Sequence, residues 1–172
     1  MTPGVYLEPV RPEDMASFTL RLQRSFTHAA KEVFPDFGEV IPPQRDIDES
    51  LLASGAEALN VMCEGRPVGG AIVTGDPQSK FLDFIFVDTE HQNRHLGSAA
   101  WQAIEARYPD AERWTLVTPY HERRNIHFYI NKCGFHITEY YNEHHPNPDF
   151  PAEEGDDYPG MDGGLFKFEK TE

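Results

Sequence analysis

The sequence predicts an α/β fold with a mixed, mostly antiparallel central sheet of about seven strands and helices on both faces. Strand-like and helix-like segments alternate along the chain. The apolar runs 58–63 and 68–74 are joined by Glu-Gly-Arg-Pro at 64–67, which is a hairpin turn signal. The run 81–87 is apolar on both faces, as expected for a central strand that is covered on both sides. The sheet should therefore combine hairpins with crossover helices.

The N-terminal third is expected to contain one strand and two helices. Residues 5–10 are expected to form a short strand, and Pro12 suits the first turn of the helix that follows. The apolar residues of that helix recur at helical spacing: Met15, Phe18, Leu22, Phe26 and Ala29. Residues 33–43 are rich in Pro, Phe and Gly and indicate a structured loop, and a second helix is expected from about Arg45 to Ala53.

The C-terminal half alternates helices with strands. One helix has its apolar stripe at Leu96, Ala100, Ala103 and Ile104. A strand over 114–117 follows, then a helix over 124–133 with Gly134 as its C-cap, and then a strand over 135–141. Residues 142–162 contain four prolines and seven acidic residues without Lys or Arg, which predicts a long loop before a closing strand over 165–170. No repeat or linker divides the chain, so residues 1–172 are expected to form a single domain.

The composition is globular and strongly acidic. Hydrophobic residues make up 39% and charged residues 26%, and the formal net charge of −14 results from 29 acidic and 15 basic side chains. A negative mean field repels phosphates, so neither nucleic acid nor an anionic membrane is an expected partner. A cationic amine substrate would be attracted. The alternative is that the acidity only serves solubility.

Several features predict a cytoplasmic protein without a metal site. The N-terminus lacks a basic region followed by an apolar core, and no apolar run approaches the roughly 18 residues of a membrane span. Cys63 and Cys133 lie in apolar stretches without metal-type pairing, which is typical of free thiols in a reducing compartment. His144 and His145 are adjacent and would point to opposite faces of a strand, and the other histidines lack metal-ligand spacing.

The segment 87–99 is the most informative part of the chain. A strand leads through a polar turn directly into a helix whose first turn contains Gly97 and Ser98. Backbone N–H groups at a helix start have no intrahelical partners and favour negative charge, so a pyrophosphate could bind there. Gly97 would allow the oxygens of the pyrophosphate to approach the backbone closely, and Arg94 would add a charged contact. Many helices that bind no ligand begin in the same way.

The same segment resembles motif A of the GNAT superfamily of N-acetyltransferases, Gln/Arg-x-x-Gly-x-Gly/Ala after the fourth strand. Gln92 takes the first position, Gly97-Ser98 ends the pattern, and His95 replaces the family's first glycine. A positive φ at this position would strain His95. Alternatively, His95 supplies its own N–H and a ring donor.

A second segment, downstream, resembles motif B of the same family, Asn-x-x-x-x-Tyr-x-x-x-Gly-Phe. It runs from Asn125 through Tyr129 to Gly134-Phe135, with one residue fewer between the asparagine and the tyrosine and with the spacing Tyr-x-x-x-x-Gly-Phe, which is common in the family. The two motifs occur in the expected order with strands between them. Together they cover about a third of the chain, and the expected element order fits the remainder.

The resemblance implies a GNAT-like fold and acetyl-CoA as the acyl donor. In the family, the fourth and fifth strands separate and admit the pantetheine arm, for which Phe86 and Val87 are the matching contacts. The positions that match the family's cofactor-binding turn are Gln92, Asn93, Arg94, His95, Leu96, Gly97 and Ser98. Asn125 and Phe128 would line the other side of the cofactor.

Two residues are candidates for proton transfer. The resemblance implies that Tyr129 protonates the departing thiolate, although Tyr129 also lies on an apolar helix stripe and could serve core packing. The amine must lose a proton, and Asp83 is the candidate base because burial in an apolar strand would raise its pKa. The alternative is a structural Asp83 paired with a hydroxyl or an arginine. His121 and Glu122 are weaker candidates that could instead cap the next helix.

The implied function is transfer of an acetyl group from acetyl-CoA to a primary amine of a small molecule or peptide, by direct attack in a ternary complex. By resemblance, the first two helices, the loop 33–43 and the acidic segment 142–162 frame the acceptor site. Dimers that pair through C-terminal strands are frequent in the family, so a homodimer is one option. The alternative function is a non-catalytic acyl-CoA sensor or a protein-interaction module on the same fold, which His95 in the glycine position favours.

Overall fold

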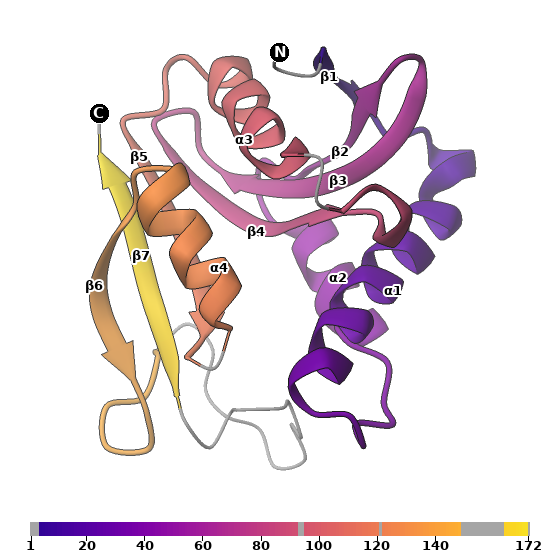
Figure 1. The fold of residues 1–172 in the computed structure, drawn as a ribbon. Coiled ribbons are helices and arrows are strands. Elements are labelled where there is room, and N and C mark those ends of the chain that lie inside the picture. The colour runs from indigo at the N-terminus through magenta and orange to yellow at the C-terminus, as the bar shows by residue number, and fades with distance from the viewer. Residues whose placement is uncertain (1–3, 93–94, 121, 149–163, 172) are drawn as a thin grey trace.

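The computed structural model describes residues 4–92, 95–120, 122–148 and 164–171, whose strands form one seven-stranded sheet in the order β1-β2-β3-β4-β5-β7-β6 (Figure 1). Within these ranges, β4 and β5 are the one parallel pair, and the other neighbours run antiparallel. The mixed, mostly antiparallel sheet predicted from the sequence is confirmed. The same ranges contain no helix that is both long enough and apolar enough to cross a membrane.

The elements follow the order expected from the sequence. The strands are β1 (Val5–Pro9), β2 (Glu57–Cys63), β3 (Arg66–Gly75), β4 (Ser79–Val87), β5 (Arg113–Pro119), β6 (His136–Tyr141) and β7 (Leu165–Thr171). The helices are α1 (Met15–Val33), α2 (Gln44–Leu52), α3 (Leu96–Arg107) and α4 (Arg123–His127). Short helical turns at Pro12–Asp14 and Thr89–His91 precede α1 and follow β4.

Helices cover both faces of the sheet, and each face has its own core (Figure 1). On one face, Phe18 and Leu22 of α1 and Ile47 of α2 pack against Ile72 and Phe86. Successive residues of a strand point to opposite faces, so the neighbours of Ile72 contribute to the other core.

That second core lies beneath α3 and α4. Trp101 and Ile104 of α3 pack there with Tyr129, which follows α4. Their partners on the sheet include Trp114 of β5 and Phe168 of β7, which are fully buried. The periodicities of the sequence therefore identified both buried faces.

A β-bulge interrupts β4 at Asp83. Ile72 of β3 pairs with Phe84 and Val73 pairs with Leu82, so Asp83 is an extra residue without a partner in the register. Such an insertion bends a strand and increases its twist. β4 and β5 pair only over Ser79–Phe81 and Arg113–Thr115, so the two strands no longer pair beyond the bulge. The edge of β4 that faces β5 is therefore open over residues 82–87.

β4 is a central strand, as predicted, and its apolar residues pack on both faces of the sheet. Leu82 belongs to the core beneath α3 and α4, and Phe86 belongs to the core beneath α1 and α2. Phe81, in the part of β4 that pairs with β5, is 42% exposed, and Asp83 is exposed as well.

The helix expected over 124–133 is also different from the prediction. It is α-helical only to His127 and continues as a π-helical turn over Phe128–Lys132, where the N–H of Cys133 donates to the Phe128 carbonyl at 3.1 Å. Gly134 follows with a φ of 82°, which confirms it as the helix end. Of the loop predicted over 142–162, the structure describes residues 142–148, including a bridge between Asn142 and His145.

Candidate active site

The open edge of β4 offers the backbone of Ile85 and Val87. The N–H of Asp88 donates to the Val68 carbonyl at 2.8 Å, which fixes the antiparallel phase between β3 and β4. In an antiparallel pair of strands, hydrogen-bonded residue pairs alternate with pairs that are not hydrogen-bonded. The backbone N–H and C=O of Phe86 therefore pair with Gly70 of β3, whereas the N–H and C=O groups of Ile85 and Val87 point toward the open edge.

This phase separates the two predicted pantetheine contacts. Val87 lies on the open edge, but the Phe86 backbone faces β3. The Phe86 side chain is 4% exposed and packs edge-on against Phe18, with ring centroids 5.5 Å apart. Sequence reasoning missed Ile85. The alternation of strand backbone groups would have identified it had the phase of the ladder been known.

The turn between β4 and α3 ends in a left-handed residue. His95 is the N-cap of α3 with φ 58° and ψ 22°, and its side chain makes no hydrogen bond that caps the helix. The positive φ expected to strain His95 is therefore present. The first-turn amides of Leu96, Gly97 and Ser98 follow directly. Asn93 and Arg94, also predicted to bind the cofactor, lie outside the described residues.

The two sequence motifs meet at Gly97 and Phe128. A Cβ atom at residue 97 would lie 3.2 Å from Cε2 of the Phe128 ring, a distance that requires the ring to shift. The Phe128 ring thus lies against Gly97 in the first turn of α3, and a larger residue at this position would require the ring to give by a few tenths of an ångström. Asn125 lies half-buried one turn before Phe128 on α4. The predicted cofactor segments are therefore adjacent in space.

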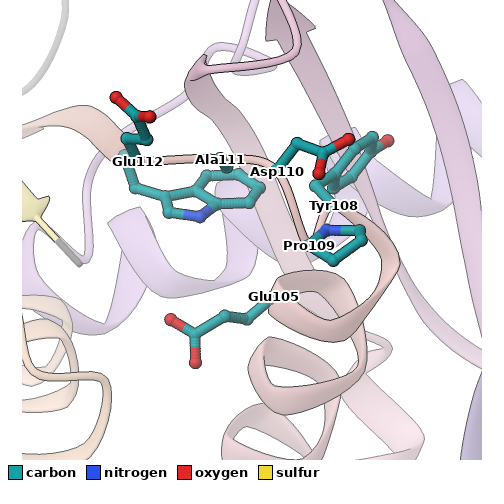
Figure 2. Close-up of a pocket in the computed structure, with 7 residues that line it drawn as sticks. Glu105, Tyr108, Pro109, Asp110, Ala111 and Glu112 are labelled. Carbon is teal, nitrogen blue, oxygen red and sulfur yellow. The ribbon is translucent and has the colours of Figure 1, made fainter.

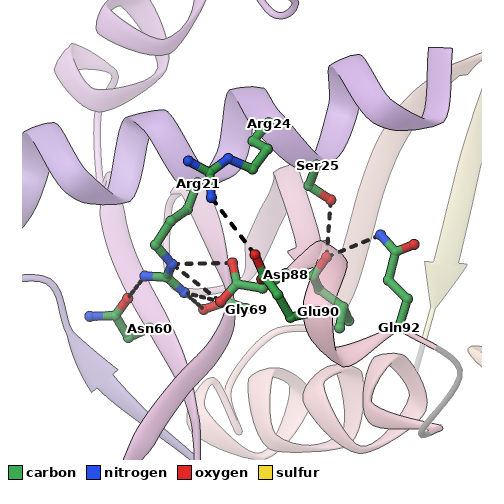
Figure 3. A network of polar contacts seen from close by, with 9 residues as sticks. Arg21, Arg24, Ser25, Asn60, Gly69, Asp88, Glu90 and Gln92 are labelled. Carbon is green, nitrogen blue, oxygen red and sulfur yellow. Dashed lines mark hydrogen bonds and ion pairs between the residues drawn. The ribbon is translucent and has the colours of Figure 1, made fainter. Parts of the chain in front are cut away.

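Gln92 acts on the strand that precedes it. Its side-chain Nε2 donates to the carbonyl oxygen of Val87 at 3.3 Å, and Ser25 Oγ of α1 donates to the same oxygen at 3.0 Å (Figure 3). The side chain of Gln92, a predicted cofactor-binding residue, is therefore directed to the end of β4.

A polar network that the sequence did not reveal fixes this strand end to α1. Arg21 makes a bidentate contact with Asp88, with Nε 3.1 Å from Oδ1 and Nη2 3.0 Å from Oδ2. Nη1 also donates to Asn60 of β2 and Nη2 to the carbonyl of Gly69 of β3, both at 3.0 Å (Figure 3). The sequence feature that could have indicated this network is the acidic residue Asp88 directly after an apolar strand.

Tyr129 lies in the core beneath α4. It is 9% exposed and its ring contacts the rings of Phe135 and Phe168. Burial raises the pKa of Tyr129 well above its usual range, and nearby Cys133 and Glu122 raise this pKa further. The phenol is therefore neutral near pH 7 and carries the proton that a general acid must give. Core packing is thus observed, and proton donation stays a prediction.

Asp83 is held by two hydroxyl groups. Ser50 Oγ of α2 donates to Oδ2 at 2.5 Å and Thr74 Oγ1 of β3 donates to Oδ1 at 3.3 Å. The residue keeps contact with solvent at the open edge, while protein atoms surround its carboxylate. This desolvation raises the pKa of Asp83 even though both hydrogen bonds lower it. The alternative interpretation predicts a pairing with a hydroxyl, and this pairing is present; the raised pKa of Asp83 is compatible with a base.

The weaker base candidates lie at the start of α4. Glu122 is the N-cap residue, and its carbonyl accepts the N–H of Ile126 at 3.0 Å, but its side chain does not cap the helix. Its charge contributes to the raised pKa of Tyr129. His121 lies outside the described residues.

A cavity of about 390 Å³ lies away from this region, between the end of α3 and the start of β5 (Figure 2). Its lining residues are Glu105, Tyr108, Pro109, Asp110, Ala111, Glu112 and Trp114. It adjoins the paired end of β4 and β5, opposite the end where the two strands separate. It therefore does not belong to the candidate active site.

Comparison with known proteins places these features in a family context. The family model described as "Acetyltransferase (GNAT) family" matches residues 22–135. An uncharacterized protein of Bacillus subtilis (strain 168), YrkN, is 43% identical over 173 residues, which cover 98% of this chain and 94% of that protein.

Solved structures of similar fold include two with a coenzyme bound. A GNAT family acetyltransferase from Elizabethkingia anophelis with acetyl-CoA bound has a TM-score of 0.67 at 14% identity, with 99% of each chain covered. A Bacillus subtilis acetyltransferase in complex with CoA has a TM-score of 0.67 at 17% identity, over 97% of this chain and 98% of that chain. The ribosomal-protein-S18-alanine N-acetyltransferase from Escherichia coli has a TM-score of 0.66 at 13% identity, with 97% of this chain and 93% of that chain covered. At these identities the likeness concerns the fold.

Proposed function

Because this chain belongs to the acetyltransferase (GNAT) family, we propose that it transfers an acetyl group from acetyl-CoA to a primary amine of a small molecule or peptide. The observation that carries the proposal is the open edge of β4, which is followed in the chain by α3, a helix whose N-cap residue His95 makes no side-chain capping bond. An extended chain with amide groups can pair with such an edge, and a diphosphate suits helix-start amides.

The residues at this place fit the donor. Acetyl-CoA supplies an activated acyl thioester. Ile85 and Val87 would hold its pantetheine arm through backbone groups, and the amides of Leu96, Gly97 and Ser98 would hold its diphosphate. Asn125 and the Phe128 ring would contact the other side of the bound molecule.

Two side chains would move protons. The amine must be neutral to attack, so Asp83 accepts a proton from the ammonium form of the acceptor, directly or through water. Tyr129 donates its phenolic proton to the sulfur as the carbon–sulfur bond breaks. An N–H of the open β4 edge donates to the acyl carbonyl oxygen, where negative charge develops. The amine attacks directly, with both substrates bound.

The proposal extends to where and how the chain works. Residues 1–172 would act as one acetyltransferase domain. Cys63 and Cys133 are free thiols, which supports a reducing cytoplasmic location. A homodimer is compatible with the family resemblance.

A non-catalytic acyl-CoA sensor or interaction module is the second candidate, and the left-handed His95 favours it. A residue with this backbone conformation and a large side chain stands where the family motif has glycine. If its imidazole blocks the turn, the donor cannot bind as proposed.

One experiment separates these functions. Thermal unfolding of the full chain is measured with and without acetyl-CoA, and thiol release is then followed with a panel of small primary amines, polyamines and basic peptides. Stabilisation together with thiol release on one or more amines supports the enzyme. Stabilisation without release on any amine supports the sensor, and unchanged unfolding temperature contradicts both donor-binding functions.

A further inference from the structure

The carbonyl oxygen of Val87 points to the open edge of β4 but is already occupied. Ser25 Oγ and Gln92 Nε2 both donate to it, at 3.0 and 3.3 Å (Figure 3). A carbonyl oxygen has two lone pairs, so both are engaged. Ser25 belongs to α1 and Gln92 to the turn before α3. Two separate parts of the chain therefore converge on one backbone atom.

The position of Ser25 is fixed by its helix. Arg21 lies one turn earlier on the same side of α1 and binds the buried carboxylate of Asp88, the residue after Val87. Ser25 itself is 7% exposed, and a hydroxyl with so little solvent contact needs a protein partner. The helix thus holds the end of β4 at two consecutive residues.

We propose that Ser25 and Gln92 are positioning residues for the acyl donor. Because both side chains donate to the Val87 carbonyl, the groups of the open edge that can still hydrogen-bond to a ligand are the Val87 N–H and the N–H and C=O of Ile85. The pantetheine arm carries two amides, and a free acceptor at Val87 would permit a second register of pairing. Gln92 then acts on the strand and not on the diphosphate. This inference rests on the proposed function, because it assumes that CoA binds at this edge.

Two ligands distinguish a strand-directed role from a phosphate-directed one. CoA contains the pantetheine arm, whereas 3′-phosphoadenosine 5′-diphosphate is its nucleotide half without the arm. Gln92→Met removes the donor at nearly constant length, and Ser25→Ala removes the hydroxyl. Loss of one hydrogen bond to the strand end should raise the Kd for CoA about five-fold in each variant, and further in the double variant. The Kd for the nucleotide should not change.

Matched variants test whether the effect belongs to these side chains. Ser25→Thr retains the hydroxyl and should restore most of the CoA affinity. Arg24→Gln alters the neighbouring exposed residue of α1, whose ion pair with Glu90 is 3.8 Å long, and should leave both dissociation constants unchanged. Thermal melting confirms that each variant is folded, and Gln92→Met alone decides the question if Ser25→Ala is unfolded.

Two results would overturn the inference while leaving the proposed function intact. A double variant that binds CoA like the wild type would show that the Ser25 hydroxyl and the Gln92 amide do not position the cofactor. An equal loss of CoA and nucleotide affinity in Gln92→Met would make Gln92 a phosphate ligand. A wild-type chain that binds no CoA would instead contradict the proposed function, and this inference with it.

Discussion

The Tyr129 hydroxyl can be tested apart from the ring that carries it. The ring packs against Phe135 and Phe168, and these contacts remain in Tyr129→Phe. The variant lacks only the proton that we assign to the departing sulfur. We expect kcat to fall roughly ten-fold or more, in line with general-acid contributions, with the Kd for CoA unchanged.

The matched control is Tyr108→Phe. Burial also raises the pKa of Tyr108, but its hydroxyl donates to Glu57 at 2.8 Å, at the far end of α3. Steady-state kinetics on any accepted amine should show a normal kcat for this variant. A wild-type kcat in Tyr129→Phe would remove Tyr129 from the mechanism.

The raised pKa of Asp83 predicts opposite pH effects on rate and on stability. Only the ionised carboxylate accepts a proton, so kcat/KM should rise with pH through the raised pKa. The native state binds this proton more tightly than the unfolded state does. The contribution of Asp83 to stability should therefore fall as pH rises from the ordinary value of about 3.9 through the raised pKa.

Asp83→Asn tests both effects at once. It should lower kcat/KM, flatten the acidic limb of the pH–rate profile and remove this part of the pH dependence of urea unfolding. Asparagine can still accept a hydrogen bond from Ser50 or Thr74, so the fold should persist. If the variant keeps the acidic limb of the wild type, another group is the base.

The left-handed conformation of His95 predicts a gain in stability on substitution by glycine. Left-handed backbone costs an L-residue about 1 kcal/mol, so His95→Gly should raise the free energy of unfolding by up to this amount. Glu64, at φ 54° in the β2–β3 turn, provides the control Glu64→Gly. Thermal melts and CoA titrations of both variants are the measurements. Weaker CoA binding in His95→Gly alone would assign a binding role to the imidazole.

At the scale of elements, the sequence predicted existence and order well and missed two single-residue insertions. Periodic apolar residues located the helices and strands to within a few positions, because burial imposes those periods. The bulge at Asp83 and the π-turn at Phe128–Lys132 each add one residue without changing composition. A single inserted residue does not change the apolar periodicity of the sequence enough to be detected.

The sequence located those parts of the candidate site that depend on local chain geometry. The turn into α3 and the Asn125–Phe135 segment were located from the sequence, and the contact of Gly97 with Phe128 confirms that they adjoin. The Arg21–Asp88 pair joins residues 67 positions apart, so it depends on how the helix packs on the sheet. No local pattern encodes such a contact.

The contact between α3 and the π-turn predicts a specific coupling. Gly97→Ala would place a methyl group 3.2 Å from Cε2 of the Phe128 ring, and the cost of moving the ring opposes the gain of up to about 1 kcal/mol that alanine brings to a helix. We therefore expect a smaller gain in unfolding free energy than at an unhindered helix position, together with weaker CoA binding. Phe128→Leu provides space, so the same glycine substitution should bring a larger gain in that background. A double-mutant cycle of thermal stability measures this difference. Additive effects would show that the ring does not restrain the helix start.

For the whole molecule, the net charge of −14 predicts how salt affects substrates. A negative field accelerates encounter with cations, and salt screens it. For a cationic amine, kcat/KM should fall several-fold between about 50 mM and about 500 mM salt. A zwitterionic amine of zero net charge should show little change under the same conditions. Equal salt dependence for both acceptors would indicate that the acidity serves solubility alone.

The unpaired side of β4 has a consequence beyond catalysis. Unsatisfied strand backbone is a template for any extended polypeptide, and proteins usually shield it to avoid aggregation. Here the pairing of β4 with β5 ends at Phe81, just before the bulge at Asp83, and residues 82–87 keep this side open. A ligand that lies along the strand would also act as a shield. Storage with CoA should thus protect the purified chain from self-association as well as from heat.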